Sequence, residues 1–195
     1  MAWLEAASVR AFARLGRDLA RVGAPAELRR SVARARRDEA RHARVAGAAA
    51  RRRGAIVPRV REASRREPSR EGIARENAVE GCVGETLSAL TLAWARSRAR
   101  AIDLRAVFAE VAEDELEHAC LSFEVHAWLM EGLSASARAR VRAAGRAALE
   151  RSLSSPALVG LAARPRAMIG GALASLVEAA FSASPRARTR PCSAT

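Results

Sequence analysis

Apolar residues recur at intervals of three and four along most of the chain, which is the spacing that places them on one side of an α-helix. This pattern predicts four long helices, over residues 2–22, 25–52, 71–98 and 103–130. Alanine and arginine, which are strong helix formers, are abundant throughout. No stretch shows the sustained alternation of apolar and polar residues that is typical of a β-strand. We therefore predict an all-α protein.

The connections between the predicted helices differ in length. Gly23-Ala24-Pro25 separates the first two helices, because glycine suits the end of a helix and proline the beginning of the next. Residues 53–71 contain Gly54, Pro58 and Pro68, many charges and no sustained period, and we expect a long connection there. Only a short break precedes the fourth helix. Two helical hairpins joined by one long crossover are the connectivity of ferritin-like four-helix bundles, which is the fold we predict.

The chain beyond the fourth helix predicts a helical extension. An amphipathic pattern continues to about residue 153, prolines then interrupt the chain, and residues 167–181 form a last apolar helix. This helix is too short to span a bilayer, and we expect it to pack on the bundle or on a second subunit, which is compatible with a homodimer. We divide the chain into the four-helix bundle, 1–132, and C-terminal helices with a disordered Arg-rich tail, 133–195.

A D-E-x-x-H motif occurs twice, as Asp38-Glu39-Ala40-Arg41-His42 and as Asp114-Glu115-Leu116-Glu117-His118. Positions three apart lie on the same face of a helix, so each glutamate projects beside its histidine. Both pairs fall within an apolar stripe, where an unpaired carboxylate would be costly. The stripes also correspond position by position at the same offset, which indicates a duplicated hairpin.

A dinuclear metal site in a helical bundle requires carboxylates and imidazoles that point into the core. Two helices each supply Glu-x-x-His, and each of the other two supplies one glutamate. The two motifs meet the first requirement with Glu39, His42, Glu115 and His118. Glu5 meets the second on the first helix, where it shares a face with the apolar residues.

The third helix offers two candidates for the remaining carboxylate, Glu80 and Glu85. Helical periodicity favours Glu80, which falls beside Val83 and Leu87. A local π-bulge, a feature that is frequent at functional sites, would instead let residues five apart face the same way. Both glutamates remain candidates.

Four motifs in order resemble a bacterial branch of the ferritin-like superfamily, which includes rubrerythrins, ferritins and di-iron oxidases and oxygenases. They are E-A-A-S-V from Glu5, D-E-A-R-H-A from Asp38, E-G-C-V-G-E-T from Glu80 and D-E-L-E-H-A from Asp114, and the resemblance spans residues 2–130. It implies a di-iron centre that reacts with dioxygen or peroxide. The ligands that it implies are Glu5, Glu39, His42, Glu115 and His118, and rubrerythrin-like members place two acidic residues on the third helix, like Glu80 and Glu85 here.

The resemblance leaves the metal and the reaction partners partly open. Oxygen ligands with two imidazoles suit iron, manganese or a mixed pair. The substrate and the electron donor are not specified. The chain has no C-x-x-C pair, so a rubredoxin-type electron-transfer domain is not expected, and it has no tyrosine, so a tyrosyl radical is excluded. Relatives often have histidine directly after the first-helix glutamate, where this chain has Ala6.

The formal net charge of +13 raises a different possibility, binding to nucleic acid. The arginines are spread over every segment and interleaved with glutamate, which favours a solvated surface over a nucleic-acid-binding one. Without a disulfide pattern or a secretory segment, a cytoplasmic setting is expected. The main hypothesis is an oxidoreductase of the oxidase, oxygenase or peroxidase type. The alternatives are an iron-sequestering protein without organic substrate and a metal-free helical interaction module.

Overall fold

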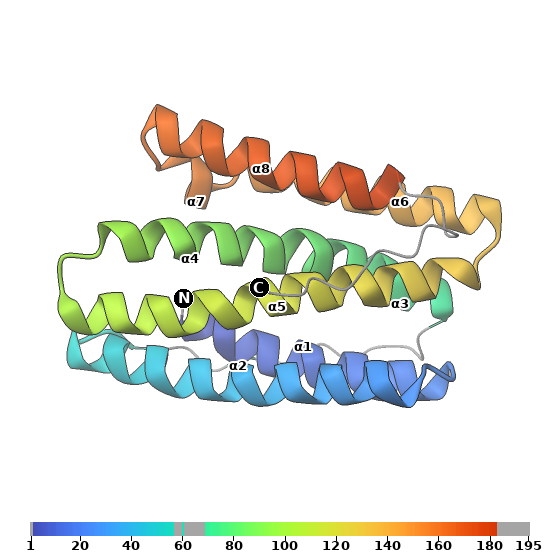
Figure 1. Ribbon diagram of the computed structural model, residues 1–195, viewed down its shortest axis with the longest axis horizontal. Helices are drawn as coiled ribbons and strands as arrows, with labels where there is room; N and C mark the ends of the chain where they lie inside the picture. Colours follow the sequence, from blue (N-terminus) through green and yellow to red (C-terminus); the bar gives the residue numbers. More distant parts are fainter. Residues whose placement is uncertain (1, 57–59, 61–68, 183–195) are drawn as a thin grey trace.

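The computed structural model describes residues 2–56, 60 and 69–182, and every structural statement below refers to these residues. They contain helices and no β-strand, so the all-α prediction is confirmed (Figure 1). The elements are, in order, α1 (Ala2–Arg21), α2 (Ala26–Arg52), α3 (Arg70–Glu76), the π-helix η1 (Asn77–Glu85), α4 (Thr86–Arg98), α5 (Ile102–Glu131), α6 (Ala135–Leu153), α7 (Pro156–Val159) and α8 (Ala163–Ser182).

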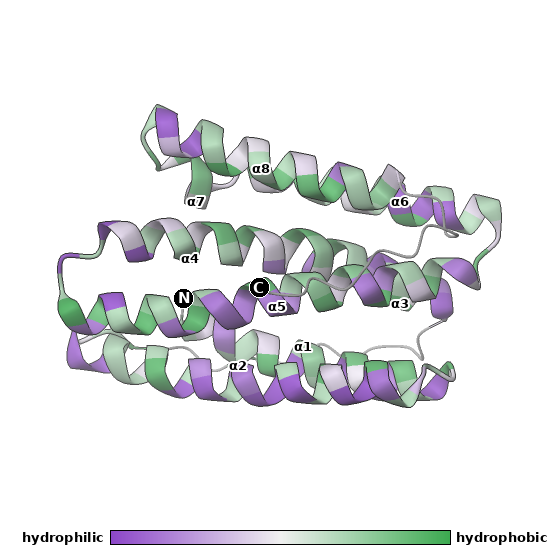
Figure 2. Ribbon diagram, in the orientation of Figure 1, coloured by the Kyte–Doolittle hydropathy of each residue, from purple (hydrophilic) through white to green (hydrophobic). Residues whose placement is uncertain are grey.

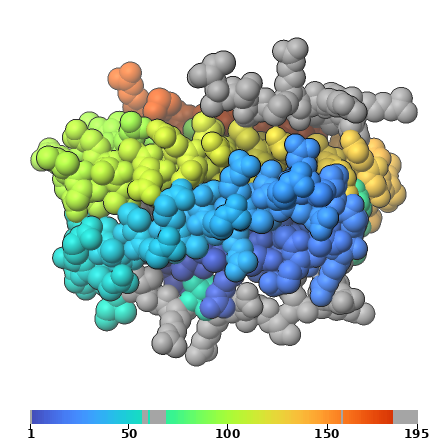
Figure 3. Space-filling view, turned by 60° about the horizontal axis from the view of Figure 1, so that its bottom comes forward, coloured from blue at the N-terminus to red at the C-terminus, as the bar shows by residue number. Residues whose placement is uncertain are grey.

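The long helices pack mainly in two pairs, α1 with α2 and α4 with α5 (Figure 1). Gly23 makes the turn between α1 and α2, and its φ of 75° lies in the left-handed region that glycine adopts without strain. The two pairs meet where α2 lies along α5, which the space-filling view shows on one face of the molecule (Figure 3). Most of the predicted long connection, residues 57–59 and 61–68, and the predicted tail from residue 183 lie outside the described residues.

The main apolar core runs through these helices and continues into the C-terminal extension, and a smaller cluster of Leu92, Val107 and Val111 lies between α4 and α5. The main core contains residues of the predicted stripes, such as Val32, Val125 and Leu129, together with Val177 and Phe181 of α8. Polar residues gather on the exposed sides of the helices, most visibly along α2 (Figure 2). No helix among the described residues is both long and apolar enough to cross a membrane. The C-terminal helices α6 and α8 therefore share the core of the helical segments that precede them.

We expected the prolines after residue 153 to break the helical structure, but Pro165 lies within a helix. It lies in the first turn of α8, which begins at Ala163. Proline is tolerated there because the amide hydrogens of the first turn have no partner within the helix. The last helix is consequently longer than predicted.

The third long helix is not regular, because nine of its residues form η1 between α3 and α4. Asn77 anchors its beginning by donating a hydrogen bond from Nδ2 to the Ser122 carbonyl oxygen of α5, at 2.9 Å. Gly81 then lies so close to α5 that a Cβ atom at this position would be 2.7 Å from the Ser122 hydroxyl oxygen. The wider turns of the π-helix change which side chains face the core.

Candidate metal centre

Four helical segments bring the acidic and histidine side chains of the predicted site together. Glu39 and His42 come from α2 and are fully buried, and Glu115 and His118 come from α5 and are almost fully buried. Glu5 of α1 is also buried. Glu85 at the end of η1 completes the cluster.

The Nδ1 atoms of both histidines face carboxylates from more than one helix. Nδ1 of His42 lies 3.5 Å from Oε2 of Glu5 and 3.6 Å from Oε1 of Glu115. Nδ1 of His118 lies 3.0 Å from Oε1 of Glu39 and 3.8 Å from Oε1 of Glu115. The two imidazoles themselves are close, with ring centroids 5.9 Å apart. Each histidine is therefore placed to act together with carboxylates from both motifs.

These side chains form two groups of potential metal ligands, each with three carboxylates and one imidazole. Within each group the ligand atoms all lie within 4.8 Å of one another; the groups are Glu5, Glu39, His42 and Glu115, and Glu39, Glu85, Glu115 and His118. Glu39 and Glu115 belong to both. A carboxylate has two oxygens, so a shared carboxylate can bind one cation through each oxygen. The arrangement can hold two adjacent cations.

Several of these polar atoms lack good partners within the described part of the chain. Neither oxygen of Glu39 has a hydrogen bond of good geometry, although His118 Nδ1 is near one of them. The Nδ1 atoms of His42 and His118 also lack a hydrogen bond of good geometry. Burial of unsatisfied polar atoms is unfavourable, and burial of a charge still more so. Metal ions would satisfy these atoms, and the donor set of carboxylate oxygen and imidazole nitrogen suits iron and manganese.

The pKa values of the buried carboxylates indicate that the cluster carries an excess of negative charge, which a cation would stabilise. Burial raises the pKa of Glu39 to about 7. The negative charges of Glu115 and Glu5 also raise this pKa, whereas the interaction with His118 lowers it. Burial and the charges of Glu115 and Glu39 raise the pKa of Glu85 well above its usual value. The carboxylates thus repel one another in a medium where little water screens them.

The pKa values of the two histidines and of Glu115 shift in the direction that favours the charged form, unlike those of Glu39 and Glu85. Burial alone would lower the pKa of His42, but interactions with Glu115, Glu5 and Asp114 outweigh it and raise the pKa to about 11. The same competition, with Glu115 and Glu39 as partners, raises the pKa of His118 to about 10. For Glu115, burial is outweighed by His118, His42 and Ser88, which lower its pKa to about 2. Protons on the histidines therefore balance part of the negative charge in the metal-free protein.

The aspartate of each motif faces the histidine of the other. Oδ2 of Asp114 lies 2.8 Å from Nε2 of His42, and Oδ2 of Asp38 lies 3.8 Å from Nε2 of His118. Arg41 donates hydrogen bonds to both aspartates and so ties α2 to α5. The Asp114 carboxylate on Nε2 of His42 orients that ring and leaves its Nδ1 free for a metal, whereas Nε2 of His118 makes no hydrogen bond within the described residues. These aspartates were not among the predicted site residues, although their repeated place before Glu39 and Glu115 was a usable signal.

The structure brings Glu85, and not Glu80, into the cluster. Glu80 is 55% exposed and forms an ion pair with Arg14 at 3.3 Å. Helical periodicity favoured Glu80 because it assumed 3.6 residues per turn, whereas residues 77–85 form a π-helix. A wider turn carries the residue five positions later to the inner face. The π-bulge that kept Glu85 among the candidates is thus present as a longer π-helix.

A cavity of about 430 Å³ opens on the α1 side of the cluster. Three of the clustered carboxylates lie in its wall, Glu5, Glu85 and Glu115, together with apolar residues of α1 such as Leu4 and Ala7. Its volume is in the range of pockets that bind small molecules. It is a possible approach to the cluster for a small reactant.

Comparisons with known proteins do not assign a family to this chain. No family model matches it, and neither the curated proteins nor the solved structures give a significant match. The ligand atoms and their spacing are therefore the basis on which a function is assigned.

Proposed function

We propose that this protein is a di-iron carboxylate protein of the ferritin-like type that acts as an oxidoreductase on dioxygen or peroxide. The observation that carries the proposal is the pair of ligand groups that share Glu39 and Glu115. In this assignment Glu5 and His42 would hold one iron, Glu85 and His118 would hold the other, and Glu39 and Glu115 would contribute to both. Manganese in one or both positions is the alternative metal content.

The distribution of the ligands over the helices supports a ferritin-like site. In di-iron carboxylate bundles one glutamate comes from each of two helices and a Glu-x-x-His pair from each of the other two. Here α1 and η1 supply the single glutamates, and α2 and α5 supply the pairs. The segments that supply them pack as α1 with α2 and η1 with α5, which is compatible with the predicted four-helix bundle.

The charge balance supports two divalent cations. Four carboxylates carry four negative charges when ionised, and neutral imidazoles carry none, so two divalent ions neutralise the site. Two Fe(II) ions can supply electrons to dioxygen or peroxide, a chemistry that the protein side chains lack. The large cavity beside Glu5 and Glu115 would admit dioxygen.

Anaerobic titration of the metal-free protein with Fe(II), followed by absorption spectroscopy on exposure to dioxygen, tests this proposal. We expect the wild type to bind two iron ions per chain and to show Fe(III) carboxylate absorption after exposure. Glu115→Ala removes a ligand of both groups and should bind little iron, while Glu80→Ala, at an exposed glutamate of the same helix as Glu85, should bind two. If the wild type and Glu115→Ala bind iron equally poorly, the proposal is wrong.

A further inference from the structure

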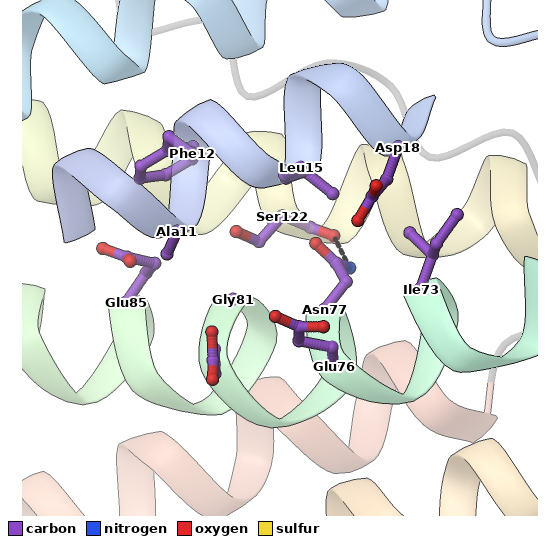
Figure 4. A pocket seen from close by; sticks show the side chains of 11 residues that line it. Ala11, Phe12, Leu15, Asp18, Ile73, Glu76, Asn77, Gly81, Glu85 and Ser122 are labelled. Carbon is purple, nitrogen blue, oxygen red and sulfur yellow. Dashed lines mark hydrogen bonds between the residues drawn. The ribbon is translucent and has the colours of Figure 1, made fainter. Parts of the chain in front are cut away.

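A narrow chamber lies between α1, η1 and α5, beside the carboxylate cluster (Figure 4). Its wall includes the polar side chains of Asp18, Asn77 and Ser122 and the apolar side chains of Phe12 and Leu15. It adjoins the cavity beside Glu5, with which it shares Ala11, Glu80 and Glu85 in its wall, but it is far smaller.

Asn77 has a buried acceptor that the chain itself does not satisfy. The side chain is only 4% exposed, and its Nδ2 donates to the Ser122 carbonyl oxygen. This hydrogen bond fixes the orientation of the carboxamide, so that Oδ1 points toward α1 and into the chamber (Figure 4). Within the described residues Oδ1 accepts no hydrogen bond. A buried acceptor without a donor is unfavourable, and the chamber is the place from which a donor can reach it.

The chamber is large enough for a few water-sized molecules. It offers about 40 Å³ to the centres of such molecules, whereas a cavity that holds one water needs an occupied volume of only about 10–15 Å³. A buried water also needs two or more polar partners, which Asn77, Asp18 and Ser122 supply. Two or three molecules that donate hydrogen bonds therefore fit the space and the chemistry of its wall.

The chamber connects the surface to the cluster. Glu80, which is 55% exposed, lies in its wall at one side, and Glu85 of the second ligand group lies in its wall as well. Apolar side chains line the stretch along α1, so the polar groups are spaced along the path instead of filling it. A small polar molecule can move along the chamber by forming hydrogen bonds with one polar side chain after another.

We propose that the chamber is hydrated and is the passage by which hydrogen peroxide, a water-sized molecule that donates hydrogen bonds, reaches the metal centre. The reactive half of this inference rests on the proposed function, while the hydration does not. Dioxygen has no hydrogen to donate and gains nothing from the Asn77 acceptor, so the passage favours peroxide over dioxygen. Two Fe(II) ions held by the cluster would supply the two electrons that, with two protons from solvent, reduce one hydrogen peroxide to two water molecules.

Two variants test the passage, with one matched control. Asn77→Leu removes the acceptor at similar volume, and Leu15→Phe narrows the chamber without changing a polar group. Leu176→Phe makes the same substitution at an exposed position of α8. We expect the rate of oxidation of bound Fe(II) by hydrogen peroxide to fall at least tenfold in the first two variants and to stay unchanged in the control.

The rate with dioxygen and the iron stoichiometry complete the test. Both should stay within twofold of the wild type in Leu15→Phe and Leu176→Phe, because the cavity beside Glu5 and the ligands are unaltered. Asn77→Leu also removes the hydrogen bond that anchors η1, so its peroxide rate counts only if its iron stoichiometry matches that of the wild type. Unchanged peroxide rates in Leu15→Phe overturn the passage even if Asn77→Leu does not fold, which circular dichroism would reveal.

A high-resolution crystal structure of the wild type tests the hydration separately. We expect two or three ordered waters in the chamber, one of them within hydrogen-bond distance of Asn77 Oδ1, and a dry chamber overturns the inference. If the wild type binds no iron, the proposed function and the peroxide passage both fail, while the waters still decide whether the chamber is hydrated.

Discussion

Metal binding at the two ligand groups should release protons, because the metal-free cluster holds protons that the metals must displace. A histidine binds a metal only in its neutral form. The pKa of His42 is about 11 and that of His118 about 10 in the metal-free protein, so both rings are charged at pH 7. Each must therefore lose one proton when it becomes a ligand.

Protons on the carboxylates add to the number that metal binding releases. Glu39, with a pKa of about 7, carries a proton in about half of the molecules at neutral pH, and the pKa of Glu85 is also raised. Glu115, with a pKa of about 2, releases none. Two histidine protons plus those on Glu39 and Glu85 give between about two and four protons for each pair of metal ions. Each released proton makes the combined affinity rise about tenfold per pH unit.

Isothermal titration calorimetry with Mn(II), in buffers of different ionisation enthalpy, measures the number of protons directly. Mn(II) avoids oxidation during the titration. We expect two to four protons per pair of ions at pH 7 and a combined affinity that rises at least about 100-fold from pH 6 to 7. His118→Ala should release at least one proton fewer, whereas Glu80→Gln should match the wild type. Release of fewer than one proton, or an affinity that does not change with pH, would refute the reasoning.

Three further predictions concern the partners of the cluster and the packing around it. Asp114→Asn removes the carboxylate on His42 Nε2 and should weaken metal binding about 10- to 100-fold without changing the stoichiometry, as measured by competition with a chelator. Gly145→Ala should destabilise the fold by about 1–3 kcal/mol in urea unfolding, because its Cβ would overlap the Phe181 ring. The metal-free protein should lose stability as pH rises from about 6.5 to 8. The pKa values of His42 and His118 are raised from 6.5 to about 11 and about 10, so their contributions are complete below pH 6.5 and are lost above it. The pKa of Glu39 is raised from 4.5 to about 7, so its contribution, on the order of 3 kcal/mol, is lost between those values. Thermal melts in a chelator should show this decline, and Glu39→Gln should reduce it.

The helices and most of the cluster could be predicted from the sequence because both depend on local spacing. Helical periodicity placed α2 and α5 within a residue or two of their observed ends, and positions three apart necessarily put Glu39 beside His42. The duplication of the motif then indicated that the two pairs face each other. These inferences require only that each helix is regular.

The choice between Glu80 and Glu85 could not be made in this way. It depends on η1, and the π-helix is accompanied by tertiary contacts, the Asn77 hydrogen bond to α5 and the close approach of Gly81 to Ser122. Periodicity within one helix contains no information about such contacts. The pairing of Asp114 with His42 has the same origin, since it joins residues 72 positions apart.

The most direct test of the account is a crystal structure of the iron-loaded protein with anomalous diffraction at the iron edge. Two anomalous peaks should lie about 3.5–4 Å apart, with Glu39 and Glu115 between them, Glu5 and His42 on one and Glu85 and His118 on the other. A single peak, peaks that do not share Glu39 and Glu115, or no iron among these residues would contradict it.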